Sequence, residues 1–204
     1  EISLLERLKA GLSKDIPVRE QQLDADELHL INGYQFLTAK PMLVILNIGE
    51  NQLPDTASLE EDLSQRLGRP GVQSATMCGI MEEELGHMDT EDENEFRKHL
   101  KAGESGALKM IRLSYHLLGY VSFFTVGADE VRAWSIVGHT PAVNAARTIH
   151  SDIERGFIRA ETVSYGDLVD CGGMQEVRRK GVLRLEGKTY TVKDGDVINF
   201  LFNV

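Results

Sequence analysis

The chain is poor in the residues that mark secreted, metal-bound or membrane-spanning proteins. It has two cysteines in 204 residues, Cys78 and Cys171, with no CxxC pair, so both are expected to be reduced structural thiols. Its six histidines are scattered without metal-ligand spacing, so no metal site is predicted. The longest apolar run, Met42 to Leu46, is too short to cross a bilayer, and no membrane partner is expected.

Basic charge is scarce as well. The formal net charge is −10, and of the 22 basic and 32 acidic side chains, 12 and 21 lie in residues 1–118. A protein with this balance does not bind RNA through its net charge, so any nucleic-acid contact must use a local basic patch. The charged, amphipathic start shows no secretory leader, and a cytoplasmic location is predicted.

Hydrophobic periodicity predicts an α+β protein whose first part is mostly helical. Leu4, Leu8 and Leu12 form one stripe of a helix over residues 2–12. After Pro17, Asp24 and Glu27 form a capping box for a second helix that runs to residue 33.

A strand, a helix and a second strand follow. Met42–Leu46 is a continuous apolar run, typical of a parallel strand buried on both faces. Thr56 or Ser58 caps a helix that ends at Gly68, and Val72 to Met77 gives the second strand. This βαβ unit is expected to be parallel, and the loops after its strands are the positions where α/β folds bind ligands.

Two further helices, predicted over residues 91–101 and 107–118, end the first part. Residues 82–95 hold eight acidic groups and no basic one, which favours solvated helix starts, with Thr90 and Glu93 as a capping box. A metal site is the less favoured alternative. Ser105 caps a helix over 107–118 that carries an apolar stripe. The stripe consists of Leu108, Ile111, Tyr115 and Leu118.

The last part alternates strands with one helix in an order that indicates a β-grasp, the ubiquitin-like roll. Two strands flank the turn Gly127–Glu130, and Thr140 caps a helix with Pro141 at its first position. Further strands are predicted, together with a short helix over 174–180. The strands cover 121–126, 131–137, 157–163, 182–186, 189–192 and a final segment with Ile198, Phe200 and Phe202 on one face.

The sequence of this last part resembles that of a known domain. FTVG..EVRAW, TPA.NAA..IH.DIE.GFIRAE and DGDVINF.FNV resemble the TGS domain that ends the YchF, or Obg-like ATPase, family. The resemblance implies a TGS β-grasp over 119–204. It also implies that residues 1–118 are the end of a helical insert and a partial parallel α/β remnant of a P-loop NTPase domain.

A second motif follows the first predicted strand. Asn47-Ile48-Gly49-Glu50, within LTAKPMLVILN, resembles the NxxE base-recognition loop that replaces the NKxD of ordinary GTPases in this family. The longer Glu and the lost Lys relax the requirement for guanine, so the resemblance implies ATP at least as well as GTP. The loop Met77-Cys78-Gly79 follows the next strand, where many GTPases place a second base-contacting loop. Only its main chain is expected to contact the base.

The phosphate-binding part of such a protein is missing from this sequence. No GxxxxGK[ST] motif occurs, and there is no Mg²⁺-binding DxxG between two strands. Without a phosphate cradle, the chain is expected to bind nucleotide weakly and to hydrolyse neither ATP nor GTP. The family therefore implies ATP or GTP with Mg²⁺ for an intact parent protein, and no cofactor or catalytic residue for this chain.

One basic group offers a route to RNA. Arg178, Arg179 and Lys180, with Arg184, are the densest cations, and the resemblance implies ribosomal RNA as the partner, with no sequence-specific DNA binding. Arg132, Arg155 and Arg159 belong to the same domain. A solvated helix face without a partner is the alternative reading of these residues. The alternative function is a non-enzymatic TGS-type module that binds RNA, the ribosome or a protein.

Overall fold

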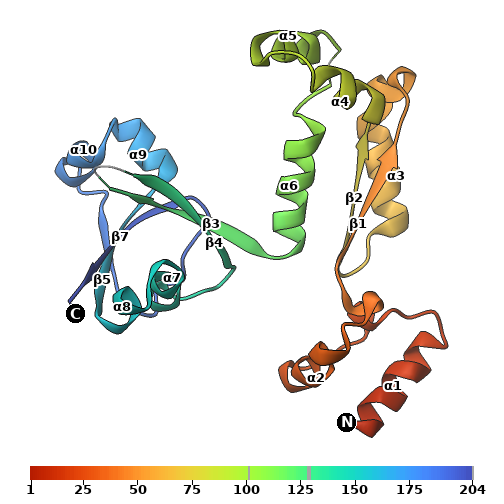
Figure 1. Ribbon diagram of the computed structural model, residues 1–204, viewed down its shortest axis with the longest axis horizontal. Helices are drawn as coiled ribbons and strands as arrows, with labels where there is room; N and C mark the ends of the chain where they lie inside the picture. The colour runs from red at the N-terminus through yellow and green to blue at the C-terminus, as the bar shows by residue number, and fades with distance from the viewer. Residues whose placement is uncertain (101, 128–129, 204) are drawn as a thin grey trace. The chain divides into compact units, whose positions relative to one another are not determined.

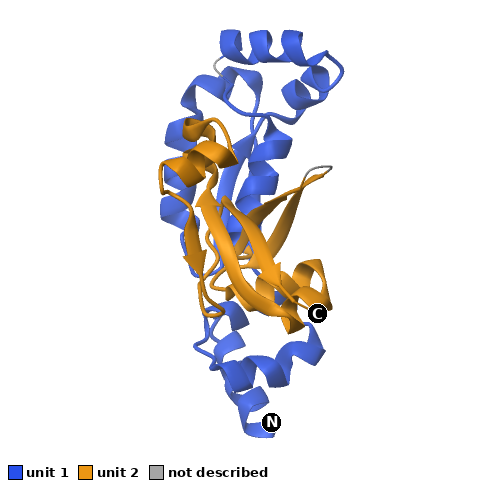
Figure 2. Ribbon diagram, turned by 90° about the vertical axis from the view of Figure 1, so that its left-hand side faces the viewer, with its two compact units in different colours: residues 1–117 blue, residues 118–204 orange. Residues whose placement is uncertain are grey.

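A computed structural model describes residues 1–100, 102–127 and 130–203, and it is a mixed α+β structure. The chain divides into two compact units, Glu1–Leu117 and Leu118–Val204 (Figure 2). The middle of the turn predicted over Gly127–Glu130 and the end of the helix predicted to reach Lys101 lie outside the described residues.

A small helical cluster opens the first unit (Figure 1). Helix α1 (Ile2–Leu12) buries Leu4 and Leu8 against Val18 and Ile31. Helix α2 (Ala25–Ile31) begins with the predicted capping box, because Asp24 accepts from the Glu27 amide at 2.8 Å and Glu27 accepts from the Asp24 amide at 3.3 Å. Short 3₁₀ segments lie between the helices and strands of the described part of this unit. They are Val18–Glu20, Asn32–Tyr34, Leu37–Ala39 and Glu50–Asp55.

The predicted βαβ unit is confirmed. Strands β1 (Met42–Asn47) and β2 (Val72–Met77) pair in parallel, from Met42 opposite Val72 to Asn47 opposite Met77. Helix α3 (Thr56–Leu67) connects them and lies on one face of the sheet, and α6 (Gly106–Leu117) lies on the other (Figure 1). The prediction that the first strand is buried on both faces is wrong, because Met42 and Leu46 are exposed.

Helices α4 (Gly79–Leu85) and α5 (Thr90–Leu100) complete the first unit. The predicted cap of α5 is wrong by one residue: Asp89, not Thr90, accepts from the Glu91 and Asp92 amides at 3.1 and 3.0 Å. Ser105 caps α6 as predicted, through the Leu108 amide. The expected apolar stripe of α6 is present, but its members Leu108 and Ile111 are exposed in this structure.

The second unit is a five-stranded sheet in the order β4-β3-β7-β5-β6. The first hairpin is antiparallel, whereas β3 and β7 run parallel at the centre. Helices α7 and α8 cover one face, where Phe123, Ile198 and Phe200 are buried; α9 and α10 cover the other, around Val163 and Val197. The strands are β3 (Tyr120–Val126), β4 (Val131–Val137), β5 (Phe157–Ser164), β6 (Arg184–Glu186) and β7 (Asp196–Phe202). The helices are α7 (Ala142–Ile149), α8 (Ser151–Arg155), α9 (Tyr165–Cys171) and α10 (Met174–Arg179).

Several predicted boundaries in this unit need correction. Pro141, not Thr140, is the N-cap of α7, and the Thr140 hydroxyl donates to the Val137 carbonyl instead. The strand predicted over 189–192 is reduced to one isolated bridge between Thr191 and Pro141. Phe202 is exposed, although Ile198 and Phe200 are buried as expected. Helices α8 and α9 were not predicted, because each is too short for a periodic pattern.

Candidate functional site

The ends of the two parallel strands bring the two predicted base-contacting loops together. Asn47 ends β1, and its side-chain Oδ1 accepts a hydrogen bond from the Gly79 amide at 3.0 Å. The Ile48 amide donates to the Met77 carbonyl at 2.9 Å. The loop after β1 is therefore tied to the loop after β2 by one side-chain and one main-chain hydrogen bond.

A side chain at position 79 would disturb this link. A Cβ on Gly79 would lie 3.3 Å from Asn47 Oδ1, which is closer than most such contacts allow. Gly79 is also the first residue of α4, so its amide has no acceptor within the helix and takes one from Asn47. Glycine at this position therefore lets the amide approach the carboxamide without a clash.

The predicted site residues divide into exposed and buried groups. Asn47 and Glu50 are exposed, and Glu50 opens the 3₁₀ turn that follows Gly49. Ile48 and Cys78 are buried at 5% and 2% exposure, in a cluster with Met81 and other apolar side chains. The Ile48 and Cys78 side chains therefore serve the core, and only their main chain borders the strand ends.

The turn that holds Glu50 and the side chain of Met77 are each fixed by local contacts. The Gly49 amide donates to Gln52 Oε1 at 3.0 Å, and this contact holds the turn in which Glu50 lies. Met77 is half-buried beside Gly106, where a Cβ would lie only 2.8 Å from the Met77 sulfur. Met77 therefore packs α6 against the sheet and presents its carbonyl to Ile48.

Exposed hydrogen-bonding side chains lie at the ends of the two parallel strands. Asn47 and Glu50 are exposed hydrogen-bonding side chains at the carboxyl ends of parallel strands, where ligands of α/β folds bind. Among the described residues, no group of three or more His, Cys, Asp or Glu side chains is arranged to hold a metal ion.

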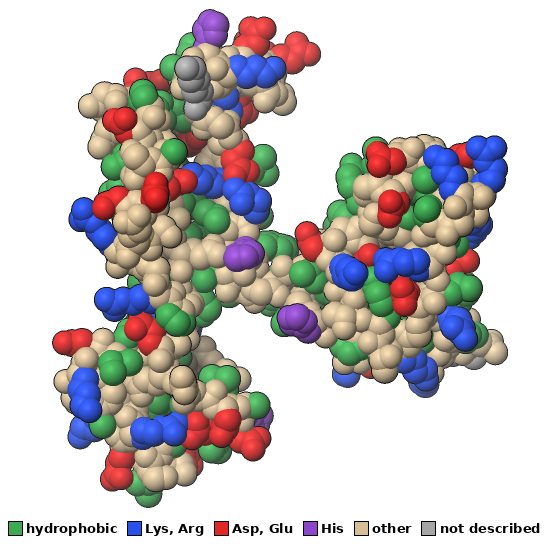
Figure 3. Space-filling view, turned by 180° about the vertical axis from the view of Figure 1, so that it is seen from behind, with side chains coloured by type: hydrophobic (Ala, Val, Ile, Leu, Met, Phe, Trp, Pro, Cys, Tyr) green, Lys and Arg blue, Asp and Glu red, His purple; other side chains and the backbone are tan. Residues whose placement is uncertain are grey.

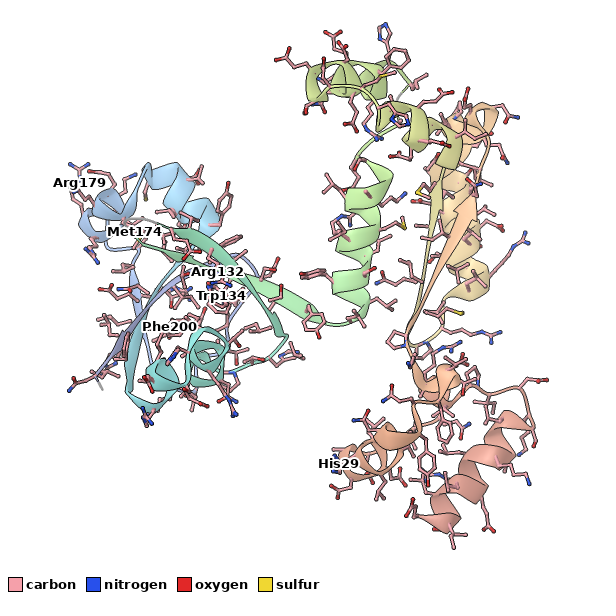
Figure 4. All side chains as sticks on the ribbon, viewed as in Figure 1. His29, Arg132, Trp134, Met174, Arg179 and Phe200 are labelled. Atoms are coloured by element: carbon pink, nitrogen blue, oxygen red, sulfur yellow. The ribbon has the colours of Figure 1, made fainter. Side chains whose placement is uncertain are left out.

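The basic group lies on and near α10 in the second unit. Arg178 donates to Glu161 at 3.3 Å and Arg179 to Glu176 at 2.5 Å, yet their side chains remain 58% and 75% exposed. Lys180 is exposed directly after them. Figure 4 shows Arg179 pointing away from the sheet, and Figure 3 shows Lys and Arg side chains gathered at this end of the unit.

Arg184 is less exposed, with 40% of its side chain accessible, because its guanidinium also serves the fold. It donates to the Tyr190 hydroxyl at 3.2 Å and to Asp196 at 3.3 Å, and Asp196 is only 2% exposed. The Tyr190 hydroxyl also donates to Asp196 at 2.7 Å. Burial and the hydrogen bond to Asp196 raise the pKa of Tyr190 to about 12.

Sequence reasoning missed a buried ion-pair network in the first unit. Arg97 is 7% exposed and donates twice to Glu82, at 2.9 and 2.7 Å, and once to Glu93 at 2.8 Å. Glu82 also accepts from the Gly106 amide at 2.9 Å. The Glu93–Arg97 spacing of four residues was the only local signal, because Glu82 lies fifteen residues from Arg97.

Comparison with curated proteins identifies nucleotide-hydrolysing relatives. The chain is 39% identical to the "Ribosome-binding ATPase YchF" of Haemophilus ducreyi over 204 residues and 39% identical to that of Bacillus subtilis over 206. Each alignment covers 100% of this chain and 56% of the relative. The chain thus spans about half the length of the curated relatives it matches.

Two solved structures have a similar fold. The Schizosaccharomyces pombe YchF GTPase matches with a TM-score of 0.82 and 29% identity, over 98% of this chain and 53% of that one. A GTP-binding protein from Pyrococcus horikoshii OT3 matches with a TM-score of 0.56 at 15% identity, over 96% of this chain and 55% of that one. The second match shows the fold alone.

The family model described as "YchF-GTPase_C: Protein of unknown function (DUF933)" matches residues 120–203. These comparisons confirm the resemblance to the YchF family, because the relatives align with the whole of this chain, which spans about half of their length. In the described ranges, no helix is both long and apolar enough to cross a membrane.

Proposed function

We propose that this chain is the C-terminal portion of a YchF-type, ribosome-associated ATPase or GTPase, and that it carries the base-recognition loop without the phosphate-binding half. The hydrogen bond from the Gly79 amide to Asn47 Oδ1 is the observation that supports this most directly. It holds two loops at the ends of parallel strands, where a flat base needs donors and acceptors in fixed positions.

The chemistry of the first loop favours a purine without strict guanine selection. In a guanine-specific loop, a short carboxylate accepts from two donors on the base edge. Glu50 is exposed in the following 3₁₀ turn, and its longer side chain can accept from the single exocyclic amine of adenine. The main chain of Met77, Cys78 and Gly79, in the loop after β2, would contact the other side of the base.

The bound group is ATP or GTP with Mg²⁺, held in the parent protein by a phosphate-binding loop that this sequence does not contain. The metal ion would neutralise charge that develops on the phosphates during hydrolysis. This chain's part is to bind and orient the base through Asn47, Glu50 and the loop after β2. The 204-residue chain alone is inactive in hydrolysis under this proposal.

We assign residues 119–204 to a TGS-type β-grasp. The parallel pair β3 and β7 at the centre of the sheet, with hairpin β3–β4 at one side, supports this assignment. Residues 1–118 are then the end of the helical insert and the nucleotide-binding domain. Arg178, Arg179 and Lys180 would contact phosphates of ribosomal RNA in the cytoplasm, with a smaller part for Arg184.

The base-site assignment is tested in the longer protein that contains this chain. Asn47→Ala should weaken ATP binding by about tenfold or more, measured by calorimetry, because it removes the carboxamide that links the two loops. Asn51→Ala, a change at an exposed position of the same loop, is the matched control and should bind like the wild type. Equal ATP affinity in Asn47→Ala and wild type would remove the assignment.

A further inference from the structure

Strand β2 has one edge paired with β1 and a second edge that faces away from it. The Gly71 and Met77 carbonyls accept from β1, so the odd-numbered residues of β2 point their main-chain groups toward β1. Successive residues of a strand point these groups to opposite sides. The N–H and C=O groups of Ser74 and Thr76 therefore face the second edge.

Side chains close this edge at Thr76. Glu60 of α3 accepts from the Thr76 amide at 2.9 Å and from its hydroxyl at 2.8 Å. Lys109 of α6 donates to the Thr76 carbonyl at 3.3 Å and also to Glu60. Two helices on opposite faces of the sheet thus meet around the strand, and both main-chain groups of Thr76 have side-chain partners. Such coverage is how proteins protect an edge strand.

The same edge is open two residues earlier. Beside Val72–Ser74 lies a groove of about 520 Å³ between the two helices. Ser64 and Leu67 of α3 form one wall, and Arg112, Leu113 and His116 of α6 form the other. The Val72 amide donates a hydrogen bond to the Arg69 carbonyl. The Val72 carbonyl and both main-chain groups of Ser74 therefore remain facing the groove.

We propose that this groove binds an extended peptide segment of a partner protein, which adds a short strand to the open edge of β2. The groups it offers are main-chain acceptors and a donor spaced along a strand, and another strand is the ligand that complements this spacing. The volume lies in the range of sites that bind a few residues or a small ligand.

A second copy of this chain fits the groove poorly. Its own β2 edge is flanked by α3 and α6, whose Glu60 and Lys109 contact Thr76, so only the short Val72–Ser74 stretch of that edge is open for pairing. A single extended segment has no such flanks. The partner is therefore a peptide tail or loop, not another folded edge.

The walls indicate which side chains the segment carries. Leu67 and Leu113 are apolar and favour an apolar residue. The Gln73 carboxamide nitrogen is engaged with His116, while its buried Oε1 has no hydrogen-bond partner among the described residues. A donor from the segment, either its main-chain amide or a polar side chain, would satisfy that oxygen.

A phage-displayed library of random short peptides, selected on the longer protein that contains this chain, tests the proposal. Enriched peptides should alter the Ser74 amide resonance, and Ser64→Trp should weaken their binding by about tenfold or more by filling the groove. Ala57→Trp, at an exposed position of the same helix outside the groove, should leave it unchanged. Ser74→Pro, which removes the edge donor, should also abolish binding, whereas Ser74→Ala should retain it.

Two outcomes would overturn the proposal. One is a library that yields no peptide family on the wild type above the level found on Ser64→Trp. The other is a set of peptides whose binding is unaffected by Ser64→Trp and which perturb β4 or β6 instead of Ser74. Because Ser64 is exposed on α3, its replacement leaves the fold intact and keeps the comparison valid if Ser74→Pro unfolds β2.

Discussion

At the scale of single residues, the Arg97–Glu82 ion pair is decisive for the stability of the first unit. The Arg97 side chain is 8% exposed and that of Glu82 18%, so neither charge is well solvated without its partner. Arg97→Ala should lower the free energy of unfolding by about 3–5 kcal/mol, because it leaves a carboxylate unpaired inside the protein. Arg66→Ala, at the exposed pair with Asp62, should cost less than about 1 kcal/mol. Urea denaturation compares them, and equal losses would contradict this account.

The same pair gives the first unit a defined acid sensitivity. Hydrogen bonds from Arg97 lower the pKa of Glu82 below its ordinary value of 4.5, despite the opposing effect of burial. A lowered folded-state pKa contributes stability above pH 4.5, and this is lost as pH falls through the folded value. Glu82→Gln should therefore be less stable than wild type at about pH 7 and approach it as pH falls below 4.5 and through the lowered folded-state pKa. Urea midpoints across this range measure the difference; a gap that does not shrink would refute the prediction.

Tyr190 gives the second unit the opposite dependence. Its pKa is raised from 10.0 to about 12, so its hydroxyl stabilises the fold fully below pH 10 and loses this effect as pH rises toward 12. Tyr190→Phe should cost about 1.5–3 kcal/mol near pH 8, because the hydroxyl donates to the buried Asp196 carboxylate. Near pH 12 the two proteins should unfold alike. Thermal unfolding at both pH values checks this, and a constant difference would count against it.

Local residue signals were the most predictable ones. The capping box of Asp24 and Glu27 could be predicted directly, since both partners lie within four residues. Asp89 and Thr90 are both good caps, so only the observed hydrogen bonds separate them. The role of Arg184 in the fold could not be predicted, because its partners Tyr190 and Asp196 come together only when the sheet forms.

At the scale of elements, β2 shows how helices protect or expose an edge. Glu60→Ala should make the Thr76 amide exchange faster with solvent, because it removes the acceptor at 2.9 Å. The Ser74 amide should exchange rapidly in the wild type already, since it faces the open groove. Residue-resolved hydrogen exchange by NMR measures both amides, with Ala75, which faces β1, as the protected reference. Equal protection of Ser74 and Ala75 would show that the edge is closed in solution.

Element type followed the hydrophobic pattern where the segment was long enough. Strands β1 to β4 and helices α1 and α6 were predicted within two residues of their observed ends. The burial of β1 was not, because an apolar run does not reveal how many neighbours its strand has in this chain. Helices α8 and α9 span five and seven residues, too few for a helical period to show.

On the scale of the whole molecule, charge is the feature that most constrains a ribosomal partner. The net charge is −10, so RNA would repel most of the surface, and binding has to rest on a few local cations. Arg178 and Arg179 are exposed enough to reach phosphates, although each already has an acidic neighbour. The proposed function therefore predicts weak association that depends strongly on salt.

Co-sedimentation of the 204-residue chain with ribosomes across a salt series tests the central claim most directly. Wild type should co-sediment at low salt and be released as salt rises. Arg178→Glu with Arg179→Glu should weaken binding and flatten the log–log salt slope by roughly one unit for each phosphate that the arginines no longer neutralise. Arg66→Glu, an exposed reversal in the first unit, should behave like wild type. Superimposable curves for wild type and the double reversal, or no association at the lowest salt, would contradict the account.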